Sequence, residues 1–243
     1  MTSQLFAICV NTTQPAGLAR FWAGVLGWEL VDDGPDGTAA ILPPRTADFR
    51  LRFLPSQRPR AGRNRAHVDL TSASAADQRH TVARAIELGA THLDVGQLPE
   101  EGHVVLADPD GNEFCVIGPG NAFLADTGTI GALACDGTRE VGLFWSAALR
   151  WPLVWDQDQE TAIQSPDGGT KITWGGPPVA PKTGENRLFL ELALPADADR
   201  WTEVDRLLGL GATLAEPSEP SGADDRTPLL DPDGNEFVLR RVR

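Results

Sequence analysis

A heptapeptide, Asp-Pro-Asp-Gly-Asn-Glu-Phe, occurs twice in this chain, at Asp108–Phe114 and at Asp231–Phe237. The copies lie 231 − 108 = 123 positions apart in a sequence of 243 residues. Chance repetition of seven residues in so short a chain is negligible, so the sequence is a tandem duplication. Pro, Asp, Gly and Asn in this order favour a tight turn, and an apolar run follows each copy. The heptapeptide therefore predicts a turn that leads into a strand near the end of each repeat.

Other segments repeat at nearly the same spacing. Phe144–Val154 aligns with Phe21–Val31 at an offset of 123, and Asn186–Leu192 aligns with Asn64–Leu70 at an offset of 122. Four glycines or prolines fall in the stretch 118–128, between the two halves. We therefore predict two domains, residues 1–122 and 127–243.

Each half contains two rounds of one pattern. In the first round an apolar run at 4–10 precedes a segment in which Leu18, Phe21, Trp22 and Val25 have the spacing of one helix face. Three short strands are then expected at 28–31, 38–42 and 49–54. After a linker at 55–63, a strand at 66–70, a helix at 75–88 and three strands at 91–95, 103–106 and 114–117 repeat the order. The sequence thus predicts an α+β fold built from βαβββ modules, two in each half.

Composition limits the class of protein. Hydrophobic residues make up 41% and charged residues 23% of the chain, as in globular proteins. A net charge of −13 opposes binding to nucleic acid or anionic membranes. No apolar stretch reaches the roughly 20 residues of a membrane span, and no signal-peptide pattern begins the chain. Three widely spaced cysteines predict neither disulfides nor a CxxC metal site. We expect a cytoplasmic monomer or homodimer whose partner is a small molecule.

Four features together resemble the vicinal-oxygen-chelate (VOC) superfamily, which includes glyoxalase I, bleomycin-resistance proteins and extradiol dioxygenases. They are the paired βαβββ modules, a helix carrying Phe-Trp before Leu-Gly-Trp (Phe21–Trp28), an Asn-Arg-X-His-X-Asp strand (Asn64–Asp69) and the closing Asp-Pro-Asp-Gly. The resemblance is closest to bacterial tandem proteins with a glyoxalase-like domain. It implies two tandem VOC domains, in which paired modules form a cup-shaped mixed sheet with helices outside. Whether the modules pair as 1+2 and 3+4 or as 1+4 and 2+3 stays open.

Metal enzymes of this superfamily take ligands from the first strand of each module, usually His, and from the last strand, usually Glu. Carried over to this chain, the first-strand position of the second module is His67, and its repeat equivalent is Phe189. The closing Glu corresponds to Cys115 and Val238, and Arg52 lies in the strand that should close the first module. The resemblance therefore implies that the usual ligand set is missing. We expect no metal cofactor, with a divalent metal as the less favoured alternative.

Strand alternation places His67 and Asp69 on one face of their strand, and Glu113 and Cys115 on one face of theirs. With the family's orientation, these four side chains converge in the cup of the first domain. A histidine beside carboxylates can act as a general base. The interpretation that we favour is that His67 donates one hydrogen bond in a half-buried strand and takes part in no chemistry.

The second half suggests a different cup. Glu113 recurs as Glu236 and Asp69 as Glu191, although this half lacks the histidine, which favours structural roles such as bonding the neighbouring Asn-Arg segment. Trp174 with Phe189 could line an apolar, metal-free cup suited to a planar ligand, and core packing is an equal alternative for Trp174.

The preferred hypothesis is metal-free binding or sequestration of a small molecule in the cups. The alternative is a lyase- or isomerase-type enzyme that uses His67 with Asp69 or Glu113, with or without a divalent metal. A protein that only binds a partner is the third hypothesis.

Overall fold

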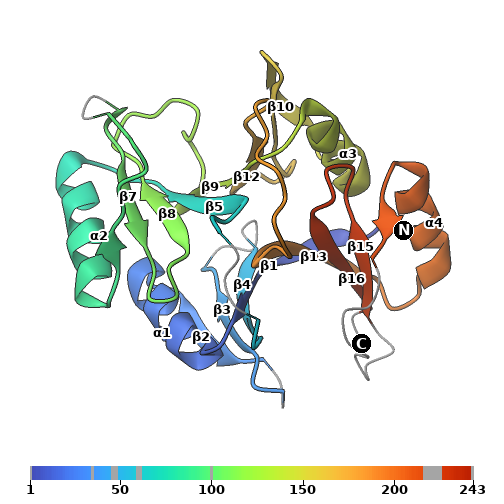
Figure 1. The fold of residues 1–243 in the computed structure, drawn as a ribbon, viewed down its shortest axis with the longest axis horizontal. Helices are drawn as coiled ribbons and strands as arrows, with labels where there is room; N and C mark the ends of the chain where they lie inside the picture. Colours follow the sequence, from blue (N-terminus) through green and yellow to red (C-terminus); the bar gives the residue numbers. More distant parts are fainter. Residues whose placement is uncertain are drawn as a thin grey trace.

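The computed structural model describes residues 2–33, 36–44, 49–58, 62–98, 101–215 and 226–241. These residues form two mixed sheets of eight strands each, with four helices on the outer sides (Figure 1). The element order is strand, helix and three strands, four times in succession. The four βαβββ modules expected from the sequence are therefore present.

The bounds of the elements follow the duplication. Module 1 consists of β1 (Gln4–Thr12), α1 (Pro15–Leu26), β2 (Glu29–Asp32), β3 (Ala39–Leu42) and β4 (Arg50–Pro55). Module 2 consists of β5 (Ala66–Leu70), α2 (Ala75–Glu87), β6 (Thr91–His92), β7 (Val104–Ala107) and β8 (Glu113–Val116). Module 3 consists of β9 (Ile130–Cys135), α3 (Arg139–Leu149), β10 (Leu153–Gln157), β11 (Glu160–Ile163) and β12 (Lys171–Trp174). Module 4 consists of β13 (Leu188–Leu194), α4 (Arg200–Gly209), β14 (Thr213–Leu214), β15 (Arg226–Leu230) and β16 (Glu236–Arg241).

The modules pair across the two halves of the sequence. Sheet A has the strand order β14-β15-β16-β13-β1-β4-β3-β2, so module 1 pairs with module 4. Sheet B has the order β10-β11-β12-β9-β5-β8-β7-β6, so module 2 pairs with module 3. The first strands meet antiparallel at both junctions, β1 with β13 and β5 with β9. Residues 1–122 and 127–243 each contribute strands to both sheets, which resolves the pairing that the sequence left open.

Helix α1 shows how the local sequence sets the packing. Pro15 begins the helix, where its missing N–H costs no intrahelical bond, and Gly27 ends it with a φ of 68°. The face that carries Leu18, Phe21 and Trp22 is buried. It packs against β3 and β4 of its own module, so the helix covers one face of sheet A.

The heptapeptide joins the modules within each half. The Trp22 ring lies 5.0 Å from the Phe114 ring, between centroids, and its indole N–H donates to Asp108. Trp145 on α3 repeats both contacts with Phe237 and Asp231. Backbone pairing thus joins modules 1 with 4 and 2 with 3, while these aromatic contacts join modules 1 with 2 and 3 with 4. No helix among the described residues has the length and apolar character needed to cross a membrane.

Candidate functional site

Each sheet has one face covered by helices; we call the opposite face of sheet A cup A and that of sheet B cup B. In sheet B the buried residues Val68 and Leu133 face the core beneath the helices. The strand register pairs Asp69 with both Cys115 and Ala132, and His67 with Ala134. Because side chains alternate along a strand, these residues lie on the cup B face.

Three of the predicted site residues meet in cup B. The ligand-type atoms of His67, Asp69 and Cys115 all lie within 4.8 Å of one another. His67 Nε2 is 3.3 Å from Asp69 Oδ1, and the two side chains are 37% and 18% exposed. This contact is not aligned as a hydrogen bond, and Oδ1 of Asp69 is buried with no hydrogen-bond partner among the described residues. The His67 contact offsets only part of the cost of burying this oxygen, so a ligand that donates to it would add the hydrogen bond that it lacks.

The thiol of Cys115 is not a nucleophile at neutral pH. Its burial, together with the negative charge of Asp69, raises the pKa of Cys115 to about 12. A thiol must lose its proton before it attacks an electrophile. Cys115 therefore forms an inert wall of the cup.

Glu113, the fourth residue predicted in this cluster, has a structural contact. Its Oε2 accepts a hydrogen bond from the backbone N–H of Asn64 at 3.4 Å. Glu236 accepts the same bond from Asn186 at 3.1 Å in the other half. The recurrence of this glutamate thus accompanies a bond to the neighbouring Asn-Arg segment. Glu113 also lines a cavity of about 530 Å³ beside the cup.

The opposite wall of cup B comes from residues that sequence reasoning missed. Lys171 and Thr173 lie on the cup face of β12, since the register places them beside Ala132 and Ala134. The Lys171 ammonium donates to the carbonyl of Phe123 and lies 4.5 Å from the centre of that ring. The Phe123 ring in turn meets Trp155 of β10 edge to face, with centroids 6.1 Å apart.

Phe123 belongs to the stretch between the two halves, which therefore supplies part of the cup. Desolvation lowers the pKa of Lys171, and the charge of Asp126 partly opposes this effect. Alternation along Lys171–Trp174 was the one sequence signal that could have identified Lys171 and Thr173. The expectation that Trp174 lines a cup instead turns Lys171 and Thr173 to the opposite face.

Trp174 lies in the core. It is 2% exposed and packs beneath α3, where it approaches Gly137 and Gly142. Phe189 lies in the other sheet, on β13, and packs with Ala7 and Cys9. The two side chains share only a small cavity of about 40 Å³ between the sheets. The structure thus does not bring Trp174 and Phe189 together on a cup face, because β12 presents Ile172 and Trp174 to the helices.

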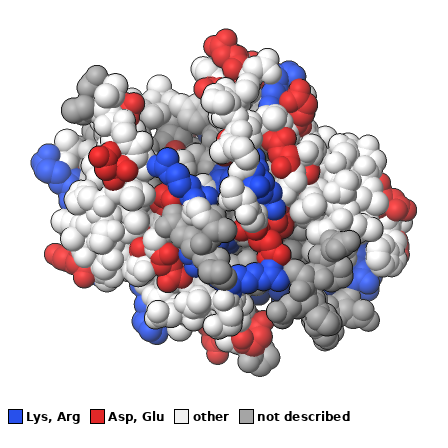
Figure 2. All heavy atoms as spheres, in the orientation of Figure 1, with Lys and Arg blue, Asp and Glu red and all other residues white. Residues whose placement is uncertain are grey.

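Cup A contains a buried ionic network in place of a histidine cluster. The carboxylate of Glu191 is 0% exposed and accepts hydrogen bonds from Arg52 and, at 3.0 Å, from Arg226. Arg52 also donates to Asp33, and Cys9 Sγ lies 3.7 Å from Glu191. Burial and the charge of Glu191 raise the pKa of Cys9 well above its ordinary value. Positive and negative side chains gather in the middle of the molecular face in Figure 2.

The side chains that could bind a metal in cup B all come from one wall of the cup. Imidazole, carboxylate and thiol are ligands that Zn²⁺ accepts, and the unpaired oxygen of Asp69 is available to it. The facing strands contribute Ala132, Ala134, Thr173 and the cation of Lys171. A metal would therefore be held by His67, Asp69 and Cys115 alone.

Comparisons with known proteins agree with this architecture. The model of the glyoxalase-like domain matches residues 7–117 and again 131–240. Glyoxalase I from Zea mays superimposes with a TM-score of 0.66 at 14% identity, covering 99% of this chain and 92% of that chain. A putative dioxygenase from Bacillus subtilis gives a TM-score of 0.62 at 13% identity, covering 99% of this chain and 85% of the other.

At such identities these structures share the fold with this chain, and the likeness says nothing of substrate. No curated protein matches the sequence. The two matches of the domain model nevertheless cover most of the chain, one in each half. This protein belongs to the glyoxalase-like domain family of the VOC superfamily and carries two copies of the domain in tandem.

Proposed function

We propose that this protein binds a planar small molecule in cup B without a metal. The observation that supports this most directly is the buried Oδ1 of Asp69, which has no hydrogen-bond partner among the described residues. A ligand that donates a hydrogen bond to this oxygen would remove the cost of leaving it unpaired. Cytoplasmic localisation and a monomeric or homodimeric state remain predictions from the sequence.

The two walls of cup B favour a ligand of limited size. Asp69 and Lys171 are both in register with Ala132, so they lie on strands two apart. Two strand spacings amount to about 10 Å, which is the length of one or two fused rings with a substituent. Phe123 and Trp155 provide an aromatic wall for such a ring. Ligand sites commonly combine apolar walls with a few convergent polar groups.

A thermal-shift screen followed by calorimetry tests this proposal. The probes are planar phenols, aromatic amines and cationic aromatic drugs, with 2-oxoaldehydes as non-planar comparators. For any probe that binds, Asp69→Asn should weaken binding about tenfold or more, because the amide cannot accept as a carboxylate does. Asp205→Asn, on the exposed surface of α4, is the matched control and should leave binding unchanged. Binding that survives Asp69→Asn would place the ligand elsewhere.

Trp155 provides a second, local readout. Its side chain is 38% exposed and lies at the aromatic wall. A bound planar probe should change the tryptophan emission of the wild type. The change should be largely lost in Trp155→Phe, which keeps an aromatic ring but removes the reporter. If the probe changed the emission of Trp155→Phe as much as that of the wild type, a ligand at this wall would be contradicted.

The cluster of three donor groups favours an enzyme as the second candidate. His67 and Asp69 are close enough for the carboxylate to orient the imidazole, which could then take a proton from a bound substrate. If a divalent metal binds to His67, Asp69 and Cys115, it would supply Lewis acidity to a substrate oxygen. A lyase or isomerase reaction would require this proton transfer.

Cobalt titration separates the metal-bound from the metal-free form. Co²⁺ bound by a thiolate gives a ligand-to-metal absorption band, so a band that appears in the wild type and is lost in Cys115→Ala would support the metal form. No band with stoichiometric Co²⁺ would support the metal-free proposal. Turnover that persists with a chelator in the wild type and is lost in His67→Ala, with binding retained, would identify the metal-free enzyme.

A further inference from the structure

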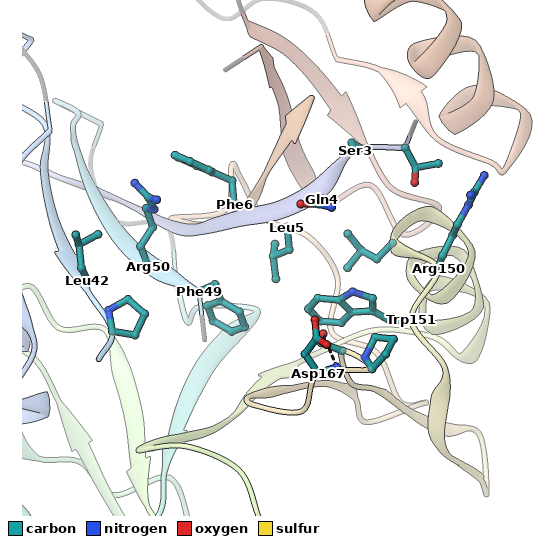
Figure 3. A pocket seen from close by; sticks show the side chains of 15 residues that line it. Ser3, Gln4, Leu5, Phe6, Leu42, Phe49, Arg50, Arg150, Trp151 and Asp167 are labelled. Atoms are coloured by element: carbon teal, nitrogen blue, oxygen red, sulfur yellow. Dashed lines mark hydrogen bonds between the residues drawn. The ribbon is translucent and has the colours of Figure 1, made fainter. Parts of the chain in front are cut away.

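Cup A contains a cluster of arginines around one aromatic ring. The guanidinium carbons of Arg50, Arg240 and Arg52 lie 4.1, 5.2 and 6.0 Å from the centre of the Phe6 ring. These side chains come from β1, β4 and β16 of sheet A, in which β4 lies beside β1, and β13 lies between β1 and β16. Figure 3 shows Phe6 and Arg50 on one side of β1 and β4, with Leu5 and Phe49 on the other. The cluster therefore faces away from the helix-covered core.

The charges of the cluster do not balance among the described residues. Arg52 is neutralised by Asp33 and Glu191, and Arg226 also contacts Glu191. Arg50 and Arg240 make no ion pair with any described residue. Within the part of the chain that the structure describes, four guanidinium groups thus face two carboxylates, an excess of two positive charges.

Arg240 provides a second, independent observation. Its Nη1 is buried and has no hydrogen-bond partner among the described residues. Guanidinium N–H groups are strong donors, and a buried one without an acceptor is destabilising. An acceptor with negative charge would satisfy it and reduce the excess.

We propose that cup A binds an organic anion, with its carboxylate or phosphate group held between Arg50 and Arg240. Arginine forks suit both of these planar or tetrahedral oxyanions. The apolar part of the ligand would lie against the partly buried rings of Phe6 and Phe189, which border the buried apolar cluster of Ala7, Cys9 and Leu54.

This site is separate from the proposed ligand site of cup B. It lies on the other sheet and differs in charge: among the described residues, cup B presents the Asp69 oxygen that lacks a hydrogen bond, and cup A presents Arg50 and Arg240, which make no ion pair. The surface of a chain with net charge −13 repels anions, so local arginines are needed to attract one. Failure of either proposal leaves the other intact.

Calorimetry with benzoate and phenyl phosphate tests the proposal, at constant ionic strength with chloride as the reference anion. At least one probe should bind, and Arg50→Met and Arg240→Met should each weaken it about tenfold or more. Arg20→Met, on the exposed face of α1, is the matched control and should not alter binding. Preference for benzoate identifies a carboxylate ligand, and preference for phenyl phosphate identifies a phosphate ester.

Protection from chemical modification provides a test on the unaltered protein, should a variant fail to fold. The dione 1,2-cyclohexanedione modifies free arginines, and peptide mass spectrometry locates the adducts. The binding probe should protect Arg50 and Arg240 and leave Arg20 modified. Absence of binding by both probes at about 10 mM, or equal protection of all three arginines, would overturn the proposal.

Discussion

The indole Nε1 of Trp22 donates a hydrogen bond to Oδ2 of Asp108 over 3.1 Å, across 86 residues of sequence. Trp145 and Asp231 form the same bond at 3.2 Å, also 86 residues apart. Asp108 is the first residue of the heptapeptide, and its Oδ1 also accepts the backbone N–H groups of Asp110 and Asn112. One carboxylate therefore shapes the turn and holds a helix of the preceding module.

We predict that Asp108→Ala lowers the free energy of unfolding by about 3 kcal/mol or more, because several buried donors lose their acceptor. Urea denaturation measures this change. Asp36→Ala is the control, since Asp36 also accepts a turn N–H, from Thr38, but lies on the surface. Asp36→Ala should lower the free energy of unfolding by only a small fraction of what Asp108→Ala does. Equal losses would show that the bond to Trp22 and the burial of Asp108 contribute little.

Glu191→Gln should destabilise the protein by about 3 to 5 kcal/mol, because it leaves Arg52 and Arg226 without the charge that neutralises them in a buried site. The matched control is Asp156→Asn, which breaks the bidentate pair with Arg139 on the surface. Surface ion pairs contribute little to stability, so this variant should unfold at nearly the same temperature as the wild type. Thermal unfolding of both variants decides the matter. A mild effect of Glu191→Gln would mean that cup A accommodates unpaired arginines.

Gly142→Ala should destabilise the fold strongly, by about 2 kcal/mol or more. A Cβ at this position would lie 1.9 Å from Oγ1 of Thr161, so α3 could not stay at its present distance from β11. Gly209→Ala in α4 meets nothing within 4 Å and should be neutral or stabilising by up to about 1 kcal/mol. Chemical denaturation of the two variants gives the comparison. Similar stabilities would contradict the close approach of α3 to sheet B.

Cys115 should make the stability pH-dependent in alkali. Its pKa is raised by burial to about 12 from 9.0, so the unfolded chain releases this proton at a lower pH than the folded protein does. Between these pH values the unfolded state binds fewer protons, and the free energy of unfolding falls by about 1.4 kcal/mol per pH unit for this thiol.

The quantity to compare is the difference in the free energy of unfolding between the wild type and Cys115→Ala. Cys9 and Cys135 are present in both proteins, so their ionisation cancels in this difference. The stability advantage of the wild type should shrink as pH rises above about 9. Urea denaturation at several pH values measures it. A constant difference between the two proteins would show that the thiol ionises equally well in the folded state.

Much of the fold was predictable because the duplication fixes equivalent positions. The heptapeptide predicted the turn, and periodicity predicted the modules. Alternation placed His67 and Asp69 on one face, and parallel pairing of Asp69 with Cys115 then brought the cluster together. These are local properties of strands, which sequence determines directly.

The remaining features depend on relations between distant segments. In each module the first strand pairs with the last strand along one edge and leaves its other edge for a second module. The sequence does not show which module will pair with that edge. The entry of Phe123 into cup B depends on the path of the segment between the halves. Trp174 was misplaced because either face of a four-residue strand can be the buried one. The arginine cluster of cup A needs β13 beside β1, because this cross-half pairing brings Arg240 of module 4 near Phe6 and Arg50 of module 1.

The pairing of the first module with the fourth and the second with the third makes each half an incomplete folding unit. A chain cut in the stretch 118–128 would leave β1 without β13 and β5 without β9, so each fragment would expose two unpaired strand edges. The simplest way for a fragment to cover them is to join a second fragment. The two halves thus have the relation of subunits in a dimer whose chains have been fused, and the covalent connection turns a concentration-dependent assembly into a single cooperative molecule.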